Sequence, residues 1–255
     1  MTHSLVGKTA LVTGGSRNIG RETALALAER GADVVITYRE RAEAAHETAQ
    51  TLEAAGVRSR ALQVDLNGTA QLDEFVEAFR EVLRDWGRST FDILVNNAGT
   101  LRLATFDAVT EEDLEANFQT NYKSVFFLTQ RLMSDLADGG RIINLGSGTA
   151  RIAFAPLVSY GPIKAAVQSL TLYLASFLGD RGITVNSVAP GGLDSEFNAE
   201  LFTNMPQAPD YIRTNTALGR IGVPRDVGSV IGFLASDEAS FISGAVLPID
   251  GGYHL

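Results

Sequence analysis

Short runs of apolar residues recur along the chain, and longer segments with helical spacing separate them. The runs are rich in Val, Ile and Leu and are mostly continuous, which is typical of parallel strands that are buried on both faces. Seven such strands are predicted, at Thr9–Thr13, Asp33–Thr37, Ser59–Val64, Asp92–Val95, Arg141–Leu145, Thr184–Val188 and Ala245–Ile249.

The segments between these runs carry apolar residues on one helical face. In the first of them Ala24, Leu27 and Ala28 share a face, and Gly31 follows where the helix should stop. The alternation of strands and helices predicts an α/β fold, namely a Rossmann-like, doubly wound, seven-stranded parallel sheet with helices on both faces. The predicted helices are Ile19–Arg30, Arg41–Ala55, Thr69–Trp86, Glu111–Leu136 and Ile163–Leu178.

No internal repeat, low-complexity tract or linker interrupts this alternation, so we expect residues 1–255 to form a single domain. Residues 191–213 break the rhythm, because they are rich in Phe, Met, Asn and Pro and lie between a strand and the next helix. Long irregular segments often form lids or binding loops. We interpret this one as a substrate-binding loop or lid, with a plain surface excursion as the alternative.

The composition excludes several kinds of site and partner. The chain has no cysteine, which excludes disulfides and thiolate ligands, and its three histidines are too few and scattered for a zinc site. A net charge of −9 argues against nucleic acid. No apolar run reaches the length of a membrane span, and the amino terminus lacks the pattern of a signal peptide. We therefore expect a cytoplasmic protein without metal, nucleic-acid or membrane partners.

Residues 13–20, TGGSRNIG, follow a predicted strand and open a helix. Glycines in that context allow a tight turn, and free backbone N–H groups at the start of the helix face a pyrophosphate. A glycine-rich turn alone is weak evidence. The strand before it, the helix after it and a second strand soon after strengthen the prediction of a dinucleotide site.

The end of the second predicted strand indicates which dinucleotide binds. An NAD enzyme places Asp or Glu near this point for the ribose hydroxyls, whereas this chain has Tyr38 and Arg39 there. Arg17 in the glycine turn and Arg41 lie nearby in the sequence. Guanidinium groups suit a 2′-phosphate because they form bidentate, charge-assisted hydrogen bonds. The pattern predicts NADP(H), and solvated surface arginines are the alternative.

Tyr160 and Lys164 are four residues apart, which places a phenol and an ammonium on one helical face. Proton exchange near neutral pH requires the tyrosine pKa to fall by about three units, or about 4 kcal/mol. A cation at about 4 Å under an effective dielectric of about 20 supplies about that much. The spacing alone is common by chance in helices.

Taken together, the motifs resemble the short-chain dehydrogenase/reductase family, and they are similar to those of its 3-oxoacyl-carrier-protein reductases. The resemblance runs from about Leu5 to Tyr253, and Ser147 precedes Tyr160 by 13 residues, the separation that the family uses. The matching motifs are residues 13–20, Asp65–Leu66, Asn96–Gly99, Asn121, Ser147, Tyr160 with Lys164, Pro190–Gly191 and Asp250–Gly252.

The resemblance implies hydride transfer between a ketone and a secondary alcohol. Tyr160 would exchange a proton with the substrate oxygen, and Ser147 would donate a hydrogen bond to it. Lys164 would lower the tyrosine pKa and bond the nicotinamide ribose, and Asn121 would hold a water that links Lys164 to solvent. The expected cofactor-binding residues are Gly14, Ser16, Arg17, Asn18, Ile19, Gly20, Tyr38, Arg39, Asp65, Leu66, Asn97, Ala98, Gly99, Tyr160, Lys164, Pro190, Gly191 and Leu193.

Ordinary structural roles are the alternative for each of these residues. Ser147 could be a turn residue at a strand end, and Asn121 could satisfy a neighbouring carbonyl inside a helix. Two departures from the family pattern also bear on the site. Asn18 stands where the family usually has glycine, although Asn tolerates left-handed backbone. Pro162 would cost little in the first turn of a helix and would bend the helix if it lay deeper.

Three functions are open: reduction of a ketone, reduction of a thioester and cofactor binding without catalysis. Residues 133–140, MSDLADGG, are acidic where a docking site for an acidic carrier protein should be basic. We therefore expect a small, largely apolar ketone or alcohol. The first alternative is a 3-oxoacyl thioester on a carrier protein or CoA, and the second is a non-enzymatic NADP(H)-binding sensor or scaffold. Residues that could equally line the pocket or belong to the core are Phe154, Phe197, Leu201, Phe202 and Met205.

Self-association is a further expectation from the resemblance, because family members usually form homotetramers through two long helices and the carboxyl-terminal segment. Apolar faces at residues 124–136 and 165–178 agree with that expectation. A face that is buried within one chain would look the same in the sequence.

Overall fold

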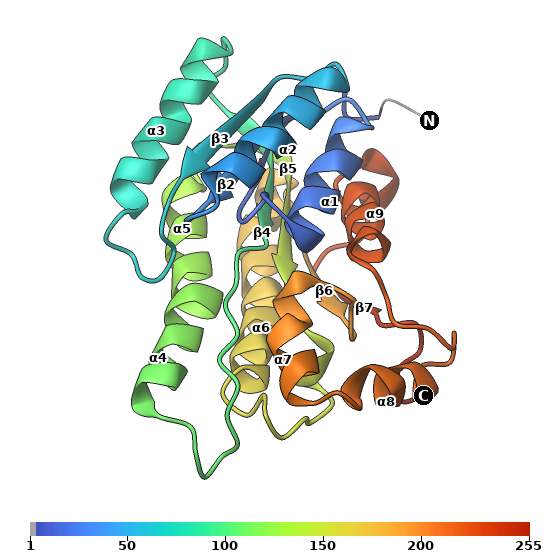
Figure 1. Cartoon of the computed structure of the whole chain (residues 1–255). Coiled ribbons are helices and arrows are strands. Elements are labelled where there is room, and N and C mark those ends of the chain that lie inside the picture. The colour runs from blue at the N-terminus through green and yellow to red at the C-terminus, as the bar shows by residue number, and fades with distance from the viewer. Residues whose placement is uncertain (1–3) are drawn as a thin grey trace.

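The structure is a computed structural model that describes residues 4–255. Its centre is a seven-stranded parallel sheet in the order β3-β2-β1-β4-β5-β6-β7, which confirms the predicted fold (Figure 1). The strand order reverses between β1 and β4, and ligands of such sheets bind beside that point, outside the carboxyl ends of the strands. The strands are β1 (Thr9–Val12), β2 (Asp33–Tyr38), β3 (Ser59–Gln63), β4 (Phe91–Asn96), β5 (Leu136–Leu145), β6 (Thr184–Pro190) and β7 (Val246–Ile249).

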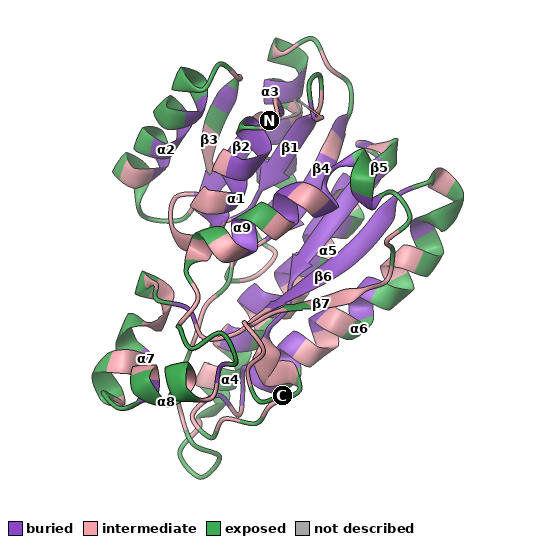
Figure 2. Cartoon of the chain, turned by 90° about the vertical axis from the view of Figure 1, so that its right-hand side faces the viewer, coloured by how far each residue is buried: buried purple, intermediate pink, exposed green. Residues whose placement is uncertain are grey.

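Helices cover both faces of the sheet. The face packed by α1, α2 and α9 and the face packed by α3, α5 and α6 have separate hydrophobic cores. Successive side chains of a strand point to opposite faces, so Ala10 and Val12 of β1 enter one core and Leu11 the other. Figure 2 shows the inner strands mostly buried between these layers, whereas β3 and β7 at the two edges of the sheet are more exposed. The longer helices are α1 (Asn18–Ala28), α2 (Ala42–Ala54), α3 (Leu72–Asp85), α4 (Glu111–Phe118), α5 (Ser124–Leu132), α6 (Gly161–Leu178) and α9 (Pro224–Leu234).

The prediction of one helix over Glu111–Leu136 is wrong in its second half. The helix is interrupted by a π-helical turn, η1 (Gln119–Lys123), and α5 ends at Leu132. Leu136 already belongs to β5, where it pairs with Phe91. Leu132 and Leu136 have helical spacing, which is why the sequence pattern extends the helix into the start of the strand. The predicted strand Arg141–Leu145 starts five residues late, since β5 begins at Leu136, and the remaining predicted ends differ from the structure by three residues at most.

Residues 191–213 contain more regular structure than the sequence analysis expected for an irregular segment. They contain a short 3₁₀ turn, η4 (Glu196–Asn198), then α7 (Ala199–Asn204) and most of α8 (Ala208–Thr214). Helices of six and seven residues are too short to show an apolar period in the sequence. α9 was expected only as an unbounded helix after residue 213, although Pro224 at its start is a recognised signal for a helix beginning.

Membrane insertion receives no support from the helices. Between residues 4 and 255, none of them is both long enough and apolar enough to span a bilayer.

The contact between α1 and α9 fixes the helix that follows the glycine turn. Gly228 of α9 lies directly against the backbone of α1, and a Cβ there would come within 2.7 Å of the Glu22 carbonyl carbon and 2.9 Å of the Thr23 nitrogen. A backbone cannot turn aside as a side chain can. The approach of the two helices therefore depends on a glycine at this position.

We predict that Gly228→Ala lowers the free energy of unfolding by about 1–3 kcal/mol, because the added methyl group forces α1 and α9 apart. Gly179→Ala is the matched control, since Gly179 has helical φ and ψ of −58° and −38° and open space around it. The control should be neutral or stabilising by up to about 1 kcal/mol. Urea unfolding followed by circular dichroism measures both, and equal effects of the two substitutions would contradict the account.

Candidate active site

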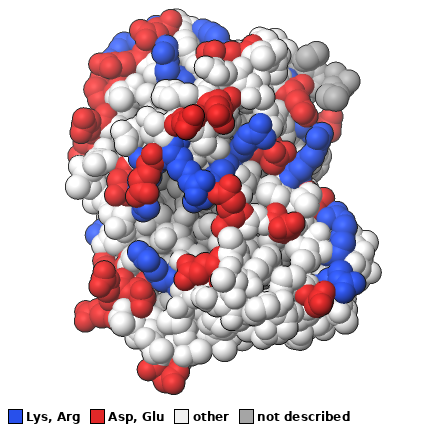
Figure 3. Space-filling model, viewed as in Figure 1, with Lys and Arg blue, Asp and Glu red and all other residues white. Residues whose placement is uncertain are grey.

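A cavity of about 510 Å³ opens at the carboxyl ends of the parallel strands. The glycine turn, the end of β2 and residues 97–101 line one part of it, and the ends of β5 and β6 with residues 195–202 line the rest. In Figure 3 this face of the molecule is hollowed near its middle, with cationic and acidic side chains at the rim. The whole set of expected cofactor-binding residues lines this cavity.

The glycine turn has the backbone that the sequence analysis anticipated. Gly14 and Asn18 have φ of 66° and 49°, so Asn18 holds the left-handed conformation in place of a glycine. A Cβ on Gly20 would lie 2.1 Å from the Gly14 carbonyl oxygen, so the turn closes only with glycine there. Asn97 of the β4 loop fixes the turn by donating to the carbonyl oxygens of Thr13 at 2.7 Å and Gly14 at 3.1 Å.

The start of α1 fits an anionic group. Its first turn contains no acidic residue. The N-cap residue is Arg17, whose side chain has only donors and so does not cap the helix backbone. The first N–H groups of the helix thus remain available to a ligand, and the helix dipole favours negative charge at this end. These features suit the pyrophosphate of a dinucleotide.

Arginines gather at the adjoining end of the cavity, as predicted, but each is paired with an acid. Arg39 pairs with Glu40 at 2.9 Å, and Arg17 and Arg41 both donate to one oxygen of Glu196, at 2.8 and 3.0 Å. The bond from Arg17 lowers the pKa of the Glu196 carboxyl group. Arg17 and Glu196 are 42% and 55% exposed, so such pairs are weak and a phosphate could replace the acids.

The sequence analysis missed both of these acids. Glu40 lies two residues beyond β2, close enough in the sequence to have been weighed against Arg39. Glu196 lies 179 residues from Arg17 in the chain, and no local pattern indicates that they meet.

The beginning of α6 removes the uncertainty about Pro162. This proline stands in the first turn of the helix, where no N–H is needed, and Gly161 donates normally to the Leu157 carbonyl at 2.8 Å. Tyr160 precedes the helix and Lys164 follows one turn later. The proline therefore leaves the tyrosine and the lysine on one side of the helix.

Tyr160 and Lys164 are both buried, with 8% and 3% of their surface exposed. Lys164 Nζ donates to the Leu145 carbonyl at 2.8 Å and lies 5.6 Å from the centroid of the Tyr160 ring. Burial lowers the pKa of Lys164 from 10.5 to about 8. Burial raises the pKa of Tyr160. The expected lowering of the tyrosine pKa is thus not what this structure shows, because burial disfavours the charged phenolate, and Tyr160 is a neutral phenol at neutral pH.

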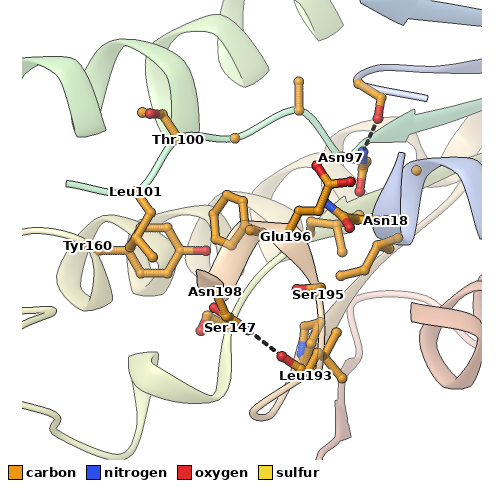
Figure 4. Close-up of a pocket in the computed structure, with 18 of the residues that line it drawn as sticks. Asn18, Asn97, Thr100, Leu101, Ser147, Tyr160, Leu193, Ser195, Glu196 and Asn198 are labelled. Atoms are coloured by element: carbon orange, nitrogen blue, oxygen red, sulfur yellow. Dashed lines mark hydrogen bonds between the residues drawn. The ribbon is translucent and has the colours of Figure 1, made fainter. Parts of the chain in front are cut away.

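Ser147 follows β5 and lines the same cavity as Tyr160. Figure 4 shows the Tyr160 hydroxyl pointing toward the middle of the pocket, with Leu101 beside the ring and Glu196 in the direction of Asn18 and Asn97. The pocket therefore holds a phenol and a serine hydroxyl beside the groove for a dinucleotide.

Asn121 is the one predicted catalytic residue outside the cavity lining. It is completely buried in the π-helical turn, and its Nδ2 donates to the carbonyls of Thr100 and Asn117, both at 2.9 Å. Its Oδ1 has no hydrogen-bond partner within residues 4–255. π-Helical turns are frequent at functional sites, and this one places an unused buried acceptor directly behind the cavity wall.

Aromatic and aliphatic side chains surround the Tyr160 hydroxyl. The Phe197 ring lies 6.4 Å from the Tyr160 ring, centroid to centroid. Of the five residues that the sequence left open between pocket wall and core, four line the cavity and Met205 does not. Sequence analysis missed several other apolar lining residues, which come from separate segments: Leu101, Ile152, Leu157, Ile212 and Tyr253.

The acidic segment at residues 133–140 does not bear on the pocket as the sequence suggested. It lies around the amino end of β5, whereas the cavity lies at the carboxyl ends of the strands. Asp135 pairs with Arg80 at 2.9 Å, and Asp138 pairs with Arg181 at 2.7 Å. Both carboxylates are thus paired with arginines and lie at the opposite end of the sheet from the cavity. They therefore give no argument against any substrate.

Comparisons with known proteins agree over almost the whole chain. A family model described as enoyl-(acyl carrier protein) reductase matches residues 14–254. The hydroxynaphthalene reductase-like protein Arp2 of Metarhizium brunneum is 35% identical over 260 residues, covering 98% of this chain and 96% of that protein. The structure of the angucycline C-6 ketoreductase LanV with bound NADP is 38% identical with a TM-score of 0.94, covering 100% of this chain and 98% of that one. A short-chain dehydrogenase/reductase from Serratia marcescens is 37% identical with a TM-score of 0.90, covering 99% and 100%.

The buried ammonium of Lys164 gives a prediction for stability. Lys164→Met should raise the free energy of unfolding at neutral pH by about 2 kcal/mol, because it removes a desolvated charge and leaves only the Leu145 carbonyl without its donor. The folded pKa of about 8 lies below the ordinary 10.5, so in that window the unfolded chain binds more protons. The wild type therefore gains stability relative to the variant as pH rises through it.

Unfolding in urea at several pH values measures this gain. Lys123→Met, at a half-buried lysine on η1, is the control. The difference in free energy of unfolding between this control and the wild type should stay constant with pH, whereas the difference for Lys164→Met should shrink as pH rises. A variant that is less stable than wild type at neutral pH would contradict the assigned cost of the Lys164 charge.

Proposed function

The chain belongs to the short-chain dehydrogenase/reductase family, and we propose that it reduces a ketone to a secondary alcohol with NADPH. The observation that carries the proposal is the buried pair at the start of α6. Tyr160 remains a protonated phenol at neutral pH, and Lys164 lies beside its ring. A protonated phenol is the form that a ketone reduction consumes, because the substrate oxygen acquires a proton as hydride arrives.

The cofactor would supply the hydride, and the protein would hold it along the groove already described. The turn at residues 14–20 would bind the pyrophosphate, and Arg17, Arg39 and Arg41 would bind the 2′-phosphate in place of Glu40 and Glu196. LanV, a relative over the whole chain, was solved with NADP bound, which supports the choice. The other cofactor contacts proposed are Asp65, Leu66, Asn97, Ala98, Gly99, Pro190, Gly191 and Leu193.

The catalytic roles that we propose follow from where charge develops. Ser147 and Tyr160 donate hydrogen bonds to the carbonyl oxygen, which becomes negative in the transition state. Tyr160 then transfers its proton to that oxygen. The charge of Lys164 stabilises the phenolate that is left, and a low local dielectric strengthens the attraction. Asn121, whose Oδ1 is a buried acceptor without a protein partner, would hold a water that returns a proton toward Lys164.

For the substrate we propose a largely apolar ketone that carries a ring. Phe154, Phe197 and Phe202 line the cavity, and the Phe197 ring lies beside that of Tyr160. Aromatic pairs favour offset or edge contacts with a flat ligand. Relatives named for hydroxynaphthalene and for angucycline ketones support the same class. A 3-oxoacyl thioester is the alternative, and it would use the aromatic walls less well.

We also propose that residues 1–255 form one domain, that residues 191–213 close over the substrate as a lid, and that the protein is a cytoplasmic homotetramer. A row of aromatic side chains on α4, η1 and α5 supports association: Phe118 and Phe126 are exposed, and Tyr122 between them is stacked on Phe118 at 5.6 Å and tilted against Phe126 at 6.4 Å. On α6, Tyr173 and Phe177 are 74% and 70% exposed. Apolar surface of this kind is unusual unless a partner covers it.

The reaction is tested with NADPH and a panel of ketones containing acetophenone, α-tetralone, β-tetralone and acetoacetyl-CoA. We predict turnover of a tetralone, and we predict that Tyr160→Phe lowers kcat about 1,000-fold while NADPH binding is unchanged. Binding of NADPH without reduction of any ketone would contradict the proposal and favour the sensor or scaffold. Preference for acetoacetyl-CoA would favour the thioester alternative.

Cofactor choice is tested by fluorescence titration with NADPH and NADH. Arg39→Asp should weaken NADPH binding about 100-fold, because it replaces a phosphate donor by a repelling carboxylate. Binding of NADH should change little. Arg225→Asp makes the same charge change at an exposed residue outside the cavity lining and should leave both affinities unchanged. If the wild type bound NADPH and NADH equally well, the proposed preference for NADPH would be wrong.

A further inference from the structure

The Ser147 hydroxyl has a second hydroxyl bound to it. Thr149 Oγ1 lies 2.8 Å from Ser147 Oγ, and the Thr149 backbone N–H donates to the same Ser147 oxygen at 3.2 Å. Both residues line the cavity that contains Tyr160. Neither the pattern of motifs nor the proposed mechanism assigns a role to Thr149.

The backbone of Ser147 is fixed independently of these two bonds. Its carbonyl accepts from the Ala150 N–H at 3.2 Å and from Gln168 Nε2 at 3.0 Å. Gln168 lies on α6, one turn beyond Lys164, so the helix that carries the lysine also holds the serine backbone. What remains free at Ser147 is the direction of its O–H bond.

The count of donors and acceptors decides that direction. A serine hydroxyl has one proton to donate and two lone pairs that accept. The Thr149 N–H can only donate, so it occupies one lone pair. If the Thr149 hydroxyl donates too, it occupies the second, and the Ser147 proton must point to a third partner. In the opposite arrangement the serine proton is spent on Thr149, and Ser147 has nothing to donate to a substrate.

We propose that Thr149 is a positioning residue for ketone reduction: its hydroxyl donates to Ser147 Oγ, so that the Ser147 proton is directed at the substrate oxygen. The inference rests on the proposed function, because it assumes that Ser147 donates to a carbonyl. Hydrogen bonds in a chain polarise one another, so the Thr149 bond also makes Ser147 a stronger donor as negative charge develops.

A purely structural role for Thr149 would not require its side-chain hydroxyl. Ser147 caps the short 3₁₀ turn Gly148–Ala150 by accepting from the Thr149 N–H, and any residue except proline at position 149 keeps that N–H. The Thr149 hydroxyl contributes nothing to this cap. Its bond to Ser147 therefore acts on the direction of the serine proton.

Thr149→Val is the sharpest variant, because it keeps the branched shape and the backbone N–H and removes only the hydroxyl. We expect kcat for a tetralone to fall about five- to tenfold, with KM and the Kd for NADPH unchanged. Thr149→Ser should restore most of the rate. Thr51→Val is the matched control, since the exposed Thr51 hydroxyl bonds only the Glu47 carbonyl within its own helix.

A double-mutant cycle with Ser147→Ala shows whether Thr149 acts through Ser147. We expect Thr149→Val to lower kcat no further once Ser147 is alanine, because the group that it directs is gone. An unchanged kcat in the single variant would overturn the inference. So would a further five- to tenfold loss in the double variant, which would mean an independent effect, or an equal loss in Thr149→Ser.

The same experiment separates this inference from the proposed function. If Tyr160→Phe and Ser147→Ala each strongly lower kcat but Thr149→Val does not, only the role of Thr149 is wrong. If the protein reduces no ketone, or Tyr160→Phe retains full activity, the proposed function fails and the inference fails with it. Thermal unfolding of each variant confirms that a lost rate is not a lost fold.

Discussion

The buried ammonium of Lys164 is the interaction on which the rest of the site depends. Its desolvation is costly, and its hydrogen bond to the Leu145 carbonyl ties α6 to the end of β5. One turn along the helix, Gln168 makes a second tie, to the Ser147 carbonyl. The helix that carries the lysine is thus fixed against the strand that leads to the serine. The lysine and the serine are held at a set separation before any ligand enters.

The groove for the dinucleotide is built by the same kind of contact between neighbouring strand ends. The Asn97 amide, just beyond β4, bonds the carbonyls of the turn that follows β1. Gly99, two residues further on, passes so close to Asn121 that a Cβ would lie 2.8 Å from its Oδ1. One loop therefore supports the glycine turn on one side and covers the π-helical turn on the other. Both halves of the site meet where the strand order reverses.

Much of this could be predicted from the sequence, because it depends on local patterns. Continuous Val, Ile and Leu runs identified the strands, and the resemblance in motif order proposed Ser147, Tyr160 and Lys164 as catalytic residues. The extent of the helix beyond Leu132 could not, because Leu136 continues the apolar spacing into a strand. The identity of the cofactor rests on arginines whose acidic partners, Glu40 and Glu196, the sequence analysis did not weigh.

Electrostatics was the hardest part to predict, since it depends on burial and on pairs that are distant in the chain. The sequence argument placed an ammonium close to the phenol and predicted a lowered tyrosine pKa. In the structure, the loss of solvent around Tyr160 dominates and raises the pKa. Likewise Asp135 and Asp138 looked like a free acidic surface, but both are paired with arginines from other elements.

The central claim is that a protonated Tyr160 beside a charged Lys164 drives reduction, and the pH dependence of a single turnover tests it most directly. NADPH bound to excess enzyme is mixed with a tetralone, and its oxidation is followed by absorbance across the neutral and alkaline range. The account predicts a constant rate up to about pH 8, where Lys164 begins to lose its charge, and a decline above it. A rate that rises with pH through that region would show that the reaction requires the phenolate, and it would contradict the account.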